Sequence, residues 1–151
     1  MDQTGEDPEG RATRVLALDL GDARIGVAIS DPERRLAVPL GTVRTGAPED
    51  LKAVAGLVRE HGVGLVVVGL PLTMAGERGV RAHHAERFAE ALRAFLAVPV
   101  VLHDERLSTV EAEGALRAAG IRGRERRRRV DRSAATVILQ SYLDAERARG
   151  A

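Results

Sequence analysis

Three short apolar segments stand close together near the N-terminus, and they restrict the folds open to this chain. They cover residues 15–18, 25–30 and 36–43, and the first ends at an aspartate followed by a glycine-bearing turn. Antiparallel neighbours can be joined by a tight turn, whereas parallel strands need a crossover of a dozen or more residues. We therefore expect the three segments to form an antiparallel meander.

Helix and strand patterns alternate over the rest of the chain. In order, they predict a helix between Pro48 and Gly62, a strand at 65–68, a helix at 80–96, a strand at 98–103, a helix from Ser108 to Gly120 and a helix from about Asp131 to Arg147. This order predicts one α/β domain over residues 14–148, whose sheet has an antiparallel edge and helices on its faces. We expect residues 1–13, which are polar and acidic, to be a disordered tail.

The composition excludes several kinds of site. The chain has no cysteine, which rules out disulfides, a thiolate nucleophile and zinc held by cysteine. The polar first residues do not resemble a secretory signal, and no apolar run reaches the roughly 18 to 20 residues that a membrane helix needs. We therefore expect a soluble, cytoplasmic protein without a membrane partner.

Positive charge is concentrated in one segment. Residues 117–132 contain eight arginines and two acids, a local charge of +6, so the rest of the chain carries −5 because the net charge is +1. Clustered cations favour a polyanion through counterion release, and we prefer nucleic-acid binding to a merely solvated charge run. The candidate contacts in this segment are Arg124, Arg126, Arg127, Arg128 and Arg129.

Acidic residues stand where the predicted elements meet. Asp19 ends the first strand, Asp104 and Glu105 end the last strand, and Asp131 opens the final helix. Sites in such sheets lie beyond the carboxyl ends of the parallel strands. Clustered carboxylates are costly to bury without a cation, and two Mg²⁺ or Mn²⁺ ions ~4 Å apart would serve phosphodiester hydrolysis. The pattern therefore predicts a divalent-metal-dependent nuclease.

Each of these acids also has a purely structural interpretation. Asp19 suits a turn, and Glu105 and Asp131 suit helix N-termini, where acidic residues are common. Because successive residues at a strand end point to opposite sides, only one of Asp104 and Glu105 can readily face a common centre. We expect Glu105 to face it, and Asp104 to brace Arg106 or a nearby backbone amide.

The chain resembles the YqgF/RuvX family, which is related to the RuvC resolvases within the ribonuclease-H-like superfamily. Four stretches carry the resemblance: Asp-Leu-Gly at 19–21 with Arg-Ile-Gly-Val-Ala at 24–28, Val-Gly-Leu-Pro-Leu at 68–72, Asp-Glu-Arg-Leu-Ser-Thr at 104–109, and Val-Asp at 130–131 leading into Ala-Ala at 134–135 and Ile-Leu-Gln at 138–140. The family commonly has Asn-Met-Asp-Gly where this chain has Thr-Met-Ala-Gly at 73–76. That departure affects expected loop contacts to the substrate, not the proposed carboxylates.

The resemblance implies a ribonuclease-H-like fold, with a five-stranded mixed sheet of order 3-2-1-4-5 whose second strand is antiparallel. It implies metal-dependent cleavage of phosphodiesters in maturing the 5′ end of pre-16S rRNA, with Holliday-junction resolution in DNA as the alternative. By motif, the catalytic and metal-binding carboxylates are Asp19, Glu105 and Asp131. Arg24 lies near Asp19 in the sequence and Arg106 follows Glu105, and both are further candidates for nucleic-acid binding. Arg24 could equally be a solvated arginine of the hairpin.

Two other functions compete. An ATP-binding enzyme of the actin and sugar-kinase type shares the Asp-x-Gly hairpin, but such proteins need a second domain for which this chain has no room. A non-catalytic RNA-binding assembly factor would use the arginines alone. With only three aromatic residues in the chain, we expect contacts to the nucleic-acid backbone and not a stacking platform. The choices between RNA and DNA, endonuclease and exonuclease, and monomer and homodimer stay open; symmetric junction cleavage would require a twofold dimer.

Overall fold

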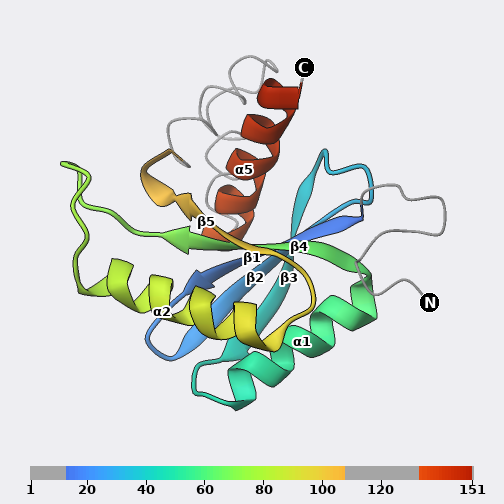
Figure 1. Cartoon of the computed structure of the whole chain (residues 1–151). Coiled ribbons are helices and arrows are strands. Elements are labelled where there is room, and N and C mark those ends of the chain that lie inside the picture. The colour runs from blue at the N-terminus through green and yellow to red at the C-terminus, as the bar shows by residue number, and fades with distance from the viewer. Residues whose placement is uncertain (1–12, 108–132, 151) are drawn as a thin grey trace.

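The computed structural model describes residues 13–107 and 133–150. In chain order its elements are β1 (Arg14–Leu20), β2 (Arg24–Ser30), β3 (Ala37–Arg44), α1 (Glu49–His61), β4 (Val63–Leu70), α2 (Val80–Phe95), β5 (Val100–Asp104) and α5 (Ala134–Gly150). The strands form a five-stranded sheet in the order β3-β2-β1-β4-β5 (Figure 1). The strand order implied by the resemblance is confirmed.

The pairing follows from the lengths of the connections. β1 with β2 and β2 with β3 are antiparallel, and β4 runs parallel to both β1 and β5. The β1–β2 turn is closed by the Gly21 N–H, which donates to the Arg24 carbonyl at 2.9 Å. A Cβ at position 21 would lie 2.6 Å from that oxygen, so this turn requires glycine.

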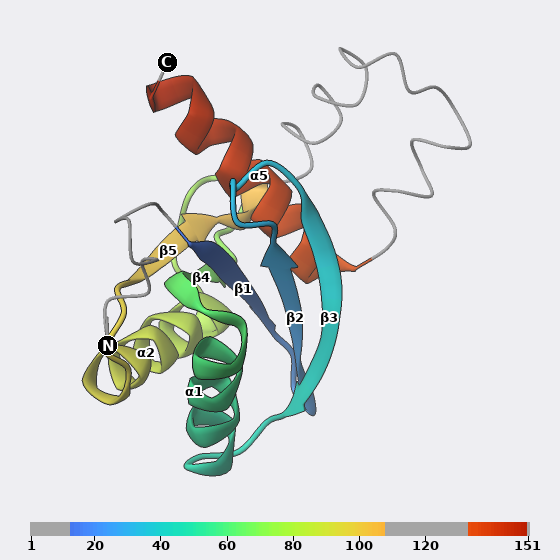
Figure 2. The same ribbon diagram turned by 90° about the vertical axis from the view of Figure 1, so that its right-hand side faces the viewer.

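The helices cover both faces of the sheet (Figure 2). On one side α1 and α2 enclose a core that includes Leu16, Leu18, Val54 and Leu92. On the other side α5 packs on a second core that includes Val15, Ala17, Val67, Ile138 and Leu139. Alternate residues of β1 thus serve opposite cores, as the period of two in a strand requires.

The helix ends show where the sequence patterns were accurate. α1 ends at Gly62, whose φ of 63° is left-handed, as the glycine predicted. α5 begins at Ala134, later than the expected start at about Asp131, because the Ser133 hydroxyl accepts the Thr136 N–H at 3.0 Å and caps the helix there. The helix predicted from Ser108 to Gly120 lies outside the described residues. Within the described ranges, no helix is long and apolar enough to cross a membrane.

Candidate active site

Asp19 lies at the carboxyl end of β1 and on the face of the sheet that α5 covers. Its place follows from alternation, because Val15 and Ala17 of the same strand belong to the core beneath α5. Across the antiparallel pair it stands opposite Gly26. A Cβ on that glycine would lie 3.8 Å from the Asp19 Cβ and 3.7 Å from the Ala135 Cβ. The carboxylate therefore sits beside the first turn of α5.

Glu105 reaches the same face from β5, with β4 lying between it and β1. In the β4–β5 register, Gly69 pairs with His103 and Leu70 with Asp104. A Cβ on Gly69 would lie 2.7 Å from Glu105 Oε2 and 2.8 Å from Ile138 Cδ1. The glutamate side chain thus occupies the space that a side chain at position 69 would need, and it extends over β4 toward Asp19.

The two carboxylates form a partly buried pair. Burial raises the pKa of Asp19, and the positive charge of Arg81 opposes this shift. Burial also raises the pKa of Glu105, and the negative charge of Asp19 raises it further, again against the effect of Arg81. The pKa of each carboxylate is raised even though Arg81 is nearby. The positive charge of Arg81 therefore does not fully offset the cost of holding two negative charges in a half-buried site.

Asp104 is directed away from this pair. Its carboxylate accepts hydrogen bonds from Arg106 Nη2 at 2.7 Å and from the Arg106 backbone N–H at 3.0 Å. The side-chain hydrogen bond from Arg106 lowers the pKa of Asp104. The contact expected between Asp104 and Arg106 is present, and the structure places Glu105, not Asp104, beside Asp19. Arg106 is exposed, and its role in nucleic-acid binding stays a prediction.

The other candidates are dispersed. Arg24 is exposed at the start of β2. His103, the histidine closest to the pair in sequence, is buried and shares a hydrogen bond of 2.9 Å with Ser141 of α5, so it has a structural role. Asp131, Arg124, Arg126, Arg127, Arg128 and Arg129 lie outside the described residues. Within the described part of the chain, no three His, Asp or Glu side chains gather as a metal site.

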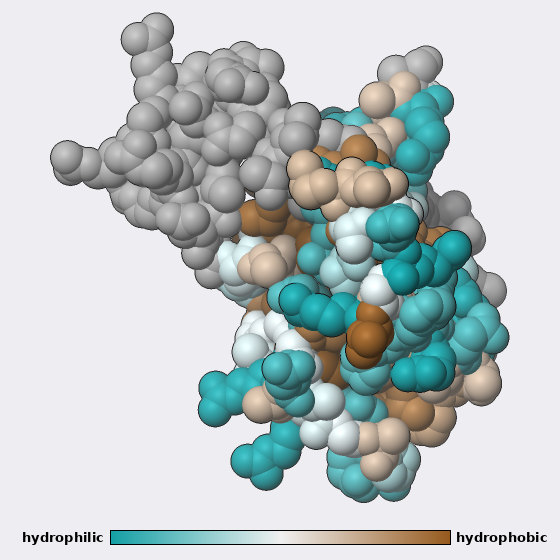
Figure 3. Space-filling model, turned by 90° about the vertical axis from the view of Figure 1, so that its left-hand side faces the viewer, coloured by the Kyte–Doolittle hydropathy of each residue, from teal (hydrophilic) through white to brown (hydrophobic). Residues whose placement is uncertain are grey.

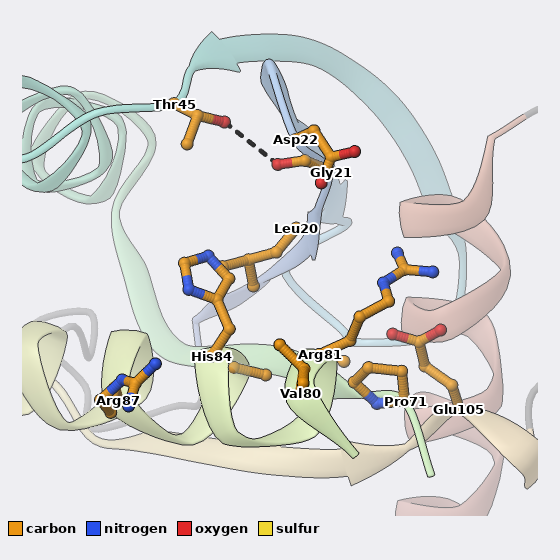
Figure 4. Close-up of a pocket in the computed structure, with 12 residues that line it drawn as sticks. Leu20, Gly21, Asp22, Thr45, Pro71, Val80, Arg81, His84, Arg87 and Glu105 are labelled. Atoms are coloured by element: carbon orange, nitrogen blue, oxygen red, sulfur yellow. Dashed lines mark hydrogen bonds between the residues drawn. The ribbon is translucent and has the colours of Figure 1, made fainter. Parts of the chain in front are cut away.

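A groove of about 300 Å³ opens next to Glu105, between the β1–β2 turn and the beginning of α2 (Figure 4). Arg81 lines it, and its side chain points toward the Glu105 carboxylate. Sequence analysis missed this residue. The signal was the spacing of Arg81, His84 and Arg87 at the start of a predicted helix, which places the three side chains on neighbouring positions of one side.

The whole site lies at the end of the sheet toward which β1 and β4 run in Figure 1. Figure 3 views the molecule from that side, and hydrophilic residues dominate the described part of this face, with apolar residues scattered between them. Such a surface suits a polar, charged substrate better than an apolar one.

Comparison with known proteins identifies the family. The RuvX family model, described as a Holliday junction resolvase, matches residues 13–145. The chain belongs to the RuvX family. The RuvX relative from Chloroflexus aurantiacus (strain ATCC 29366 / DSM 635 / J-10-fl) is 51% identical over 134 residues, which cover 88% of each protein. The relative from Anaeromyxobacter sp. (strain Fw109-5) is 53% identical over 136 residues, or 89% of this chain and 99% of that protein.

Both relatives carry the name "Putative pre-16S rRNA nuclease". Among solved structures, T. thermophilus RuvC in complex with Holliday junction substrate aligns with a TM-score of 0.57 and 17% sequence identity, over 89% of this chain and 96% of that chain. At this identity the likeness shows a shared fold. The family and the fold that the sequence motifs indicated are both confirmed.

Proposed function

We propose that this RuvX protein is a divalent-metal-dependent nuclease that hydrolyses phosphodiester bonds in pre-16S rRNA. The observation that carries the proposal is the pairing of Asp19 with Glu105 at the carboxyl ends of β1 and β5, where each carboxylate has a raised pKa. The names of the two relatives support the substrate, and the family description supports the class of reaction.

The donor set suits a hard divalent cation such as Mg²⁺ or Mn²⁺, because its ligands are carboxylate oxygens that lack sufficient counter-charge. Asp19 and Glu105 would hold the metal, and we propose Asp131 as a further ligand. When bound, a pair of such ions would activate a water and stabilise the leaving oxygen of the phosphodiester.

The protein's own contribution is to hold the two carboxylates in place. Gly69 leaves room for Glu105 over β4. His103 ties β5 to α5 through Ser141 at 2.9 Å, which fixes the strand that ends directly before Glu105. The ion pair of Asp104 with Arg106 keeps a third negative charge directed away from the pair. Such preorganisation matters because displacements near 1 Å at a catalytic group can cost about a hundredfold in rate.

The test compares cleavage of labelled pre-16S rRNA, four-way junction DNA and single strands by the wild type and by Glu105→Gln. Glu105→Gln keeps the size of the side chain but removes its charge, so cleavage should disappear in Mg²⁺ while the protein still folds. Glu33→Gln is the matched control, because Glu33 is exposed in the β2–β3 turn at the opposite end of the strands. Cleavage that survives in Glu105→Gln, or in excess chelator, would refute the proposal.

Resolution of Holliday junctions is the second candidate, favoured by the description of the family model. It requires paired cuts and therefore two copies of the site related by a twofold axis. Symmetric cleavage of the junction by a dimer, without cleavage of pre-rRNA, would favour it. Nucleic-acid binding without cleavage of any of the substrates would instead favour a non-catalytic assembly factor.

A further inference from the structure

One wall of the groove beside Glu105 is basic. Arg81, His84 and Arg87 of α2 all line it, and Figure 4 shows Arg81 nearest to Glu105, with His84 and Arg87 farther along the helix. An α-helix rises 1.5 Å per residue, so Arg81 and Arg87 are separated by about 9 Å along the axis. This separation allows the two guanidinium groups to contact different phosphates of one strand.

The two arginines of this wall differ from their neighbours on α2: the charge of Arg81 acts on Asp19 and Glu105, and Arg87 lines the groove farther along the helix. Arg78 and His83, which flank them in sequence, contact Glu86 at 2.7 and 3.4 Å. Among the described residues, neither Arg81 nor Arg87 takes part in an ion pair or a side-chain hydrogen bond. Arginine is well matched to phosphate because its planar fork can donate two parallel hydrogen bonds.

The opposite wall is formed by the β1–β2 turn and by Thr45. The Thr45 hydroxyl donates to the Gly21 carbonyl at 3.3 Å, and the Thr45 N–H donates to the Ala23 carbonyl at 3.0 Å. These bonds join the turn to the end of β3, so the wall has a defined position. The described residues that line the groove include no Phe, Tyr or Trp, and the only aromatic ring among them is the imidazole of His84. The groove therefore offers charge for a sugar-phosphate backbone but no extended aromatic surface for base stacking.

We propose that Arg81, His84 and Arg87 form a phosphate-binding wall, which holds the backbone of the nucleic-acid strand that leads to Asp19 and Glu105. Arg81 contacts the phosphate closest to the cleaved bond, and Arg87 contacts a phosphate farther along the strand. The inference rests on the proposed nuclease function, because the groove begins at the carboxylate pair. It assigns substrate binding to α2, in addition to the arginines of residues 117–132.

The test measures binding in the absence of metal. A short fluorescein-labelled RNA is titrated with protein in EDTA over a range of salt concentrations, and anisotropy gives the affinity. The double variant Arg81→Ala/Arg87→Ala should reduce the slope of log affinity against log salt by about 1.4, since each phosphate neutralised on a single strand contributes roughly 0.7. Arg81→Lys/Arg87→Lys keeps the charge and should retain most of the slope.

The matched control is Arg35→Ala/Arg59→Ala, which removes the same charge from exposed positions in the β2–β3 turn and the last turn of α1. Its slope should stay close to that of the wild type. Thermal melts verify that all variants fold. A double variant of Arg81 and Arg87 whose slope equals that of the control overturns the phosphate-binding wall.

A second measurement uses the absence of cysteine from the chain. His84→Cys and Arg59→Cys are each labelled with a thiol-reactive photo-crosslinker and irradiated with the RNA. The wall is supported if crosslinking at position 84 exceeds crosslinking at position 59 and is abolished by unlabelled competitor RNA. Equal yields at the two positions overturn it.

Because neither measurement requires cleavage, a protein that binds through α2 but never cleaves would refute the nuclease alone. A protein that cleaves with an unchanged slope would refute only the wall.

Discussion

Replacing Gly69 by alanine should impair the proposed active site while the sheet remains folded. The new Cβ would lie 2.7 Å from Glu105 Oε2 and 2.8 Å from Ile138 Cδ1, whereas ordinary contacts begin at 3.4 Å. The carboxylate oxygen must therefore move by about 0.7 Å and the Ile138 methyl by about 0.6 Å. The glutamate can rotate at its side-chain torsions, so we expect it to leave its place beside Asp19.

The magnitude follows from the size of this displacement. Since an error of 1 Å in placing a catalytic group costs about a hundredfold, a shift of roughly 0.7 Å should lower kcat by about 10- to 100-fold. Overpacking against Ile138 should cost about 1 to 3 kcal/mol of the free energy of unfolding. Alanine in a strand loses less conformational entropy on folding than glycine, and this offsets about 0.5 to 1 kcal/mol of the loss in the free energy of unfolding.

Steady-state cleavage and thermal unfolding are measured on the same preparations. Gly26→Ala is the control, because its Cβ would meet its nearest neighbours at 3.7 to 3.9 Å, which is ordinary contact. In the double variant Gly69→Ala/Ile138→Val the Cδ1 methyl is absent, so stability should recover while activity stays low. Full activity of Gly69→Ala, or recovery of activity together with stability in the double variant, would refute the role of Gly69 in placing Glu105.

Four further predictions concern the same site and the basic segment. Glu105→Gln should abolish cleavage and Asp104→Asn should reduce it only partly, as rate measurements on both variants will show; the reverse result would exchange their roles. Mg²⁺ or Mn²⁺ should support cleavage and Ca²⁺ should not, because calcium accepts looser, higher coordination; metal titrations after chelation check this. Burial raises the pKa of Glu105 in the folded protein above the pKa of about 4.3 that glutamate has in the unfolded chain. The ionised carboxylate should therefore lower the free energy of unfolding increasingly as the pH rises from the unfolded pKa through the folded pKa. In EDTA, Glu105→Gln should therefore have a higher Tm than the wild type at neutral pH and no advantage below pH ~4, and equal Tm values at both pH values would contradict this. Replacing Arg126, Arg127, Arg128 and Arg129 by alanine should lower the slope of log affinity for nucleic acid against log salt by roughly 0.7 to 0.9 for each phosphate that the variant no longer binds. An unchanged slope would show that these arginines form a solvated charge run.

Much of the fold could be predicted because its signals are local. The short connections between β1, β2 and β3 determine antiparallel pairing, and the uninterrupted apolar run in β4 indicates a strand buried on both faces. The start of α5 was predicted wrongly for a reason that is also local. Asp131 and Ser133 are both good capping residues, and only the hydrogen bond to the Thr136 N–H shows that Ser133 is the cap.

The site could be predicted only in part. The proximity of Asp19 and Glu105 could be predicted because the carboxyl ends of parallel strands in α/β sheets lie at the same end of the sheet; their catalytic role stays a prediction. Arg81 was not found, because charged residues on a helix are usually solvated, and the spacing of Arg81, His84 and Arg87 places them on one side of a helix without showing that this side faces a groove. Its position depends on how α2 crosses the sheet, and this is decided by packing of residues such as Ala85 and Leu92 against the core.

The arrangement of charges depends on the register of β5. The acids Asp19 and Glu105 lie on the face of the sheet covered by α5, whereas Arg81 comes from α2 on the opposite face. The charges therefore meet only beyond the carboxyl ends of the strands. A shift of β5 by one residue would exchange the faces of Asp104 and Glu105. The hydrogen bond of His103 to Ser141, which joins β5 to α5, opposes such a shift. The register that brings two repelling carboxylates together is thus stabilised by their neighbours, because the pair itself favours separation until a cation binds.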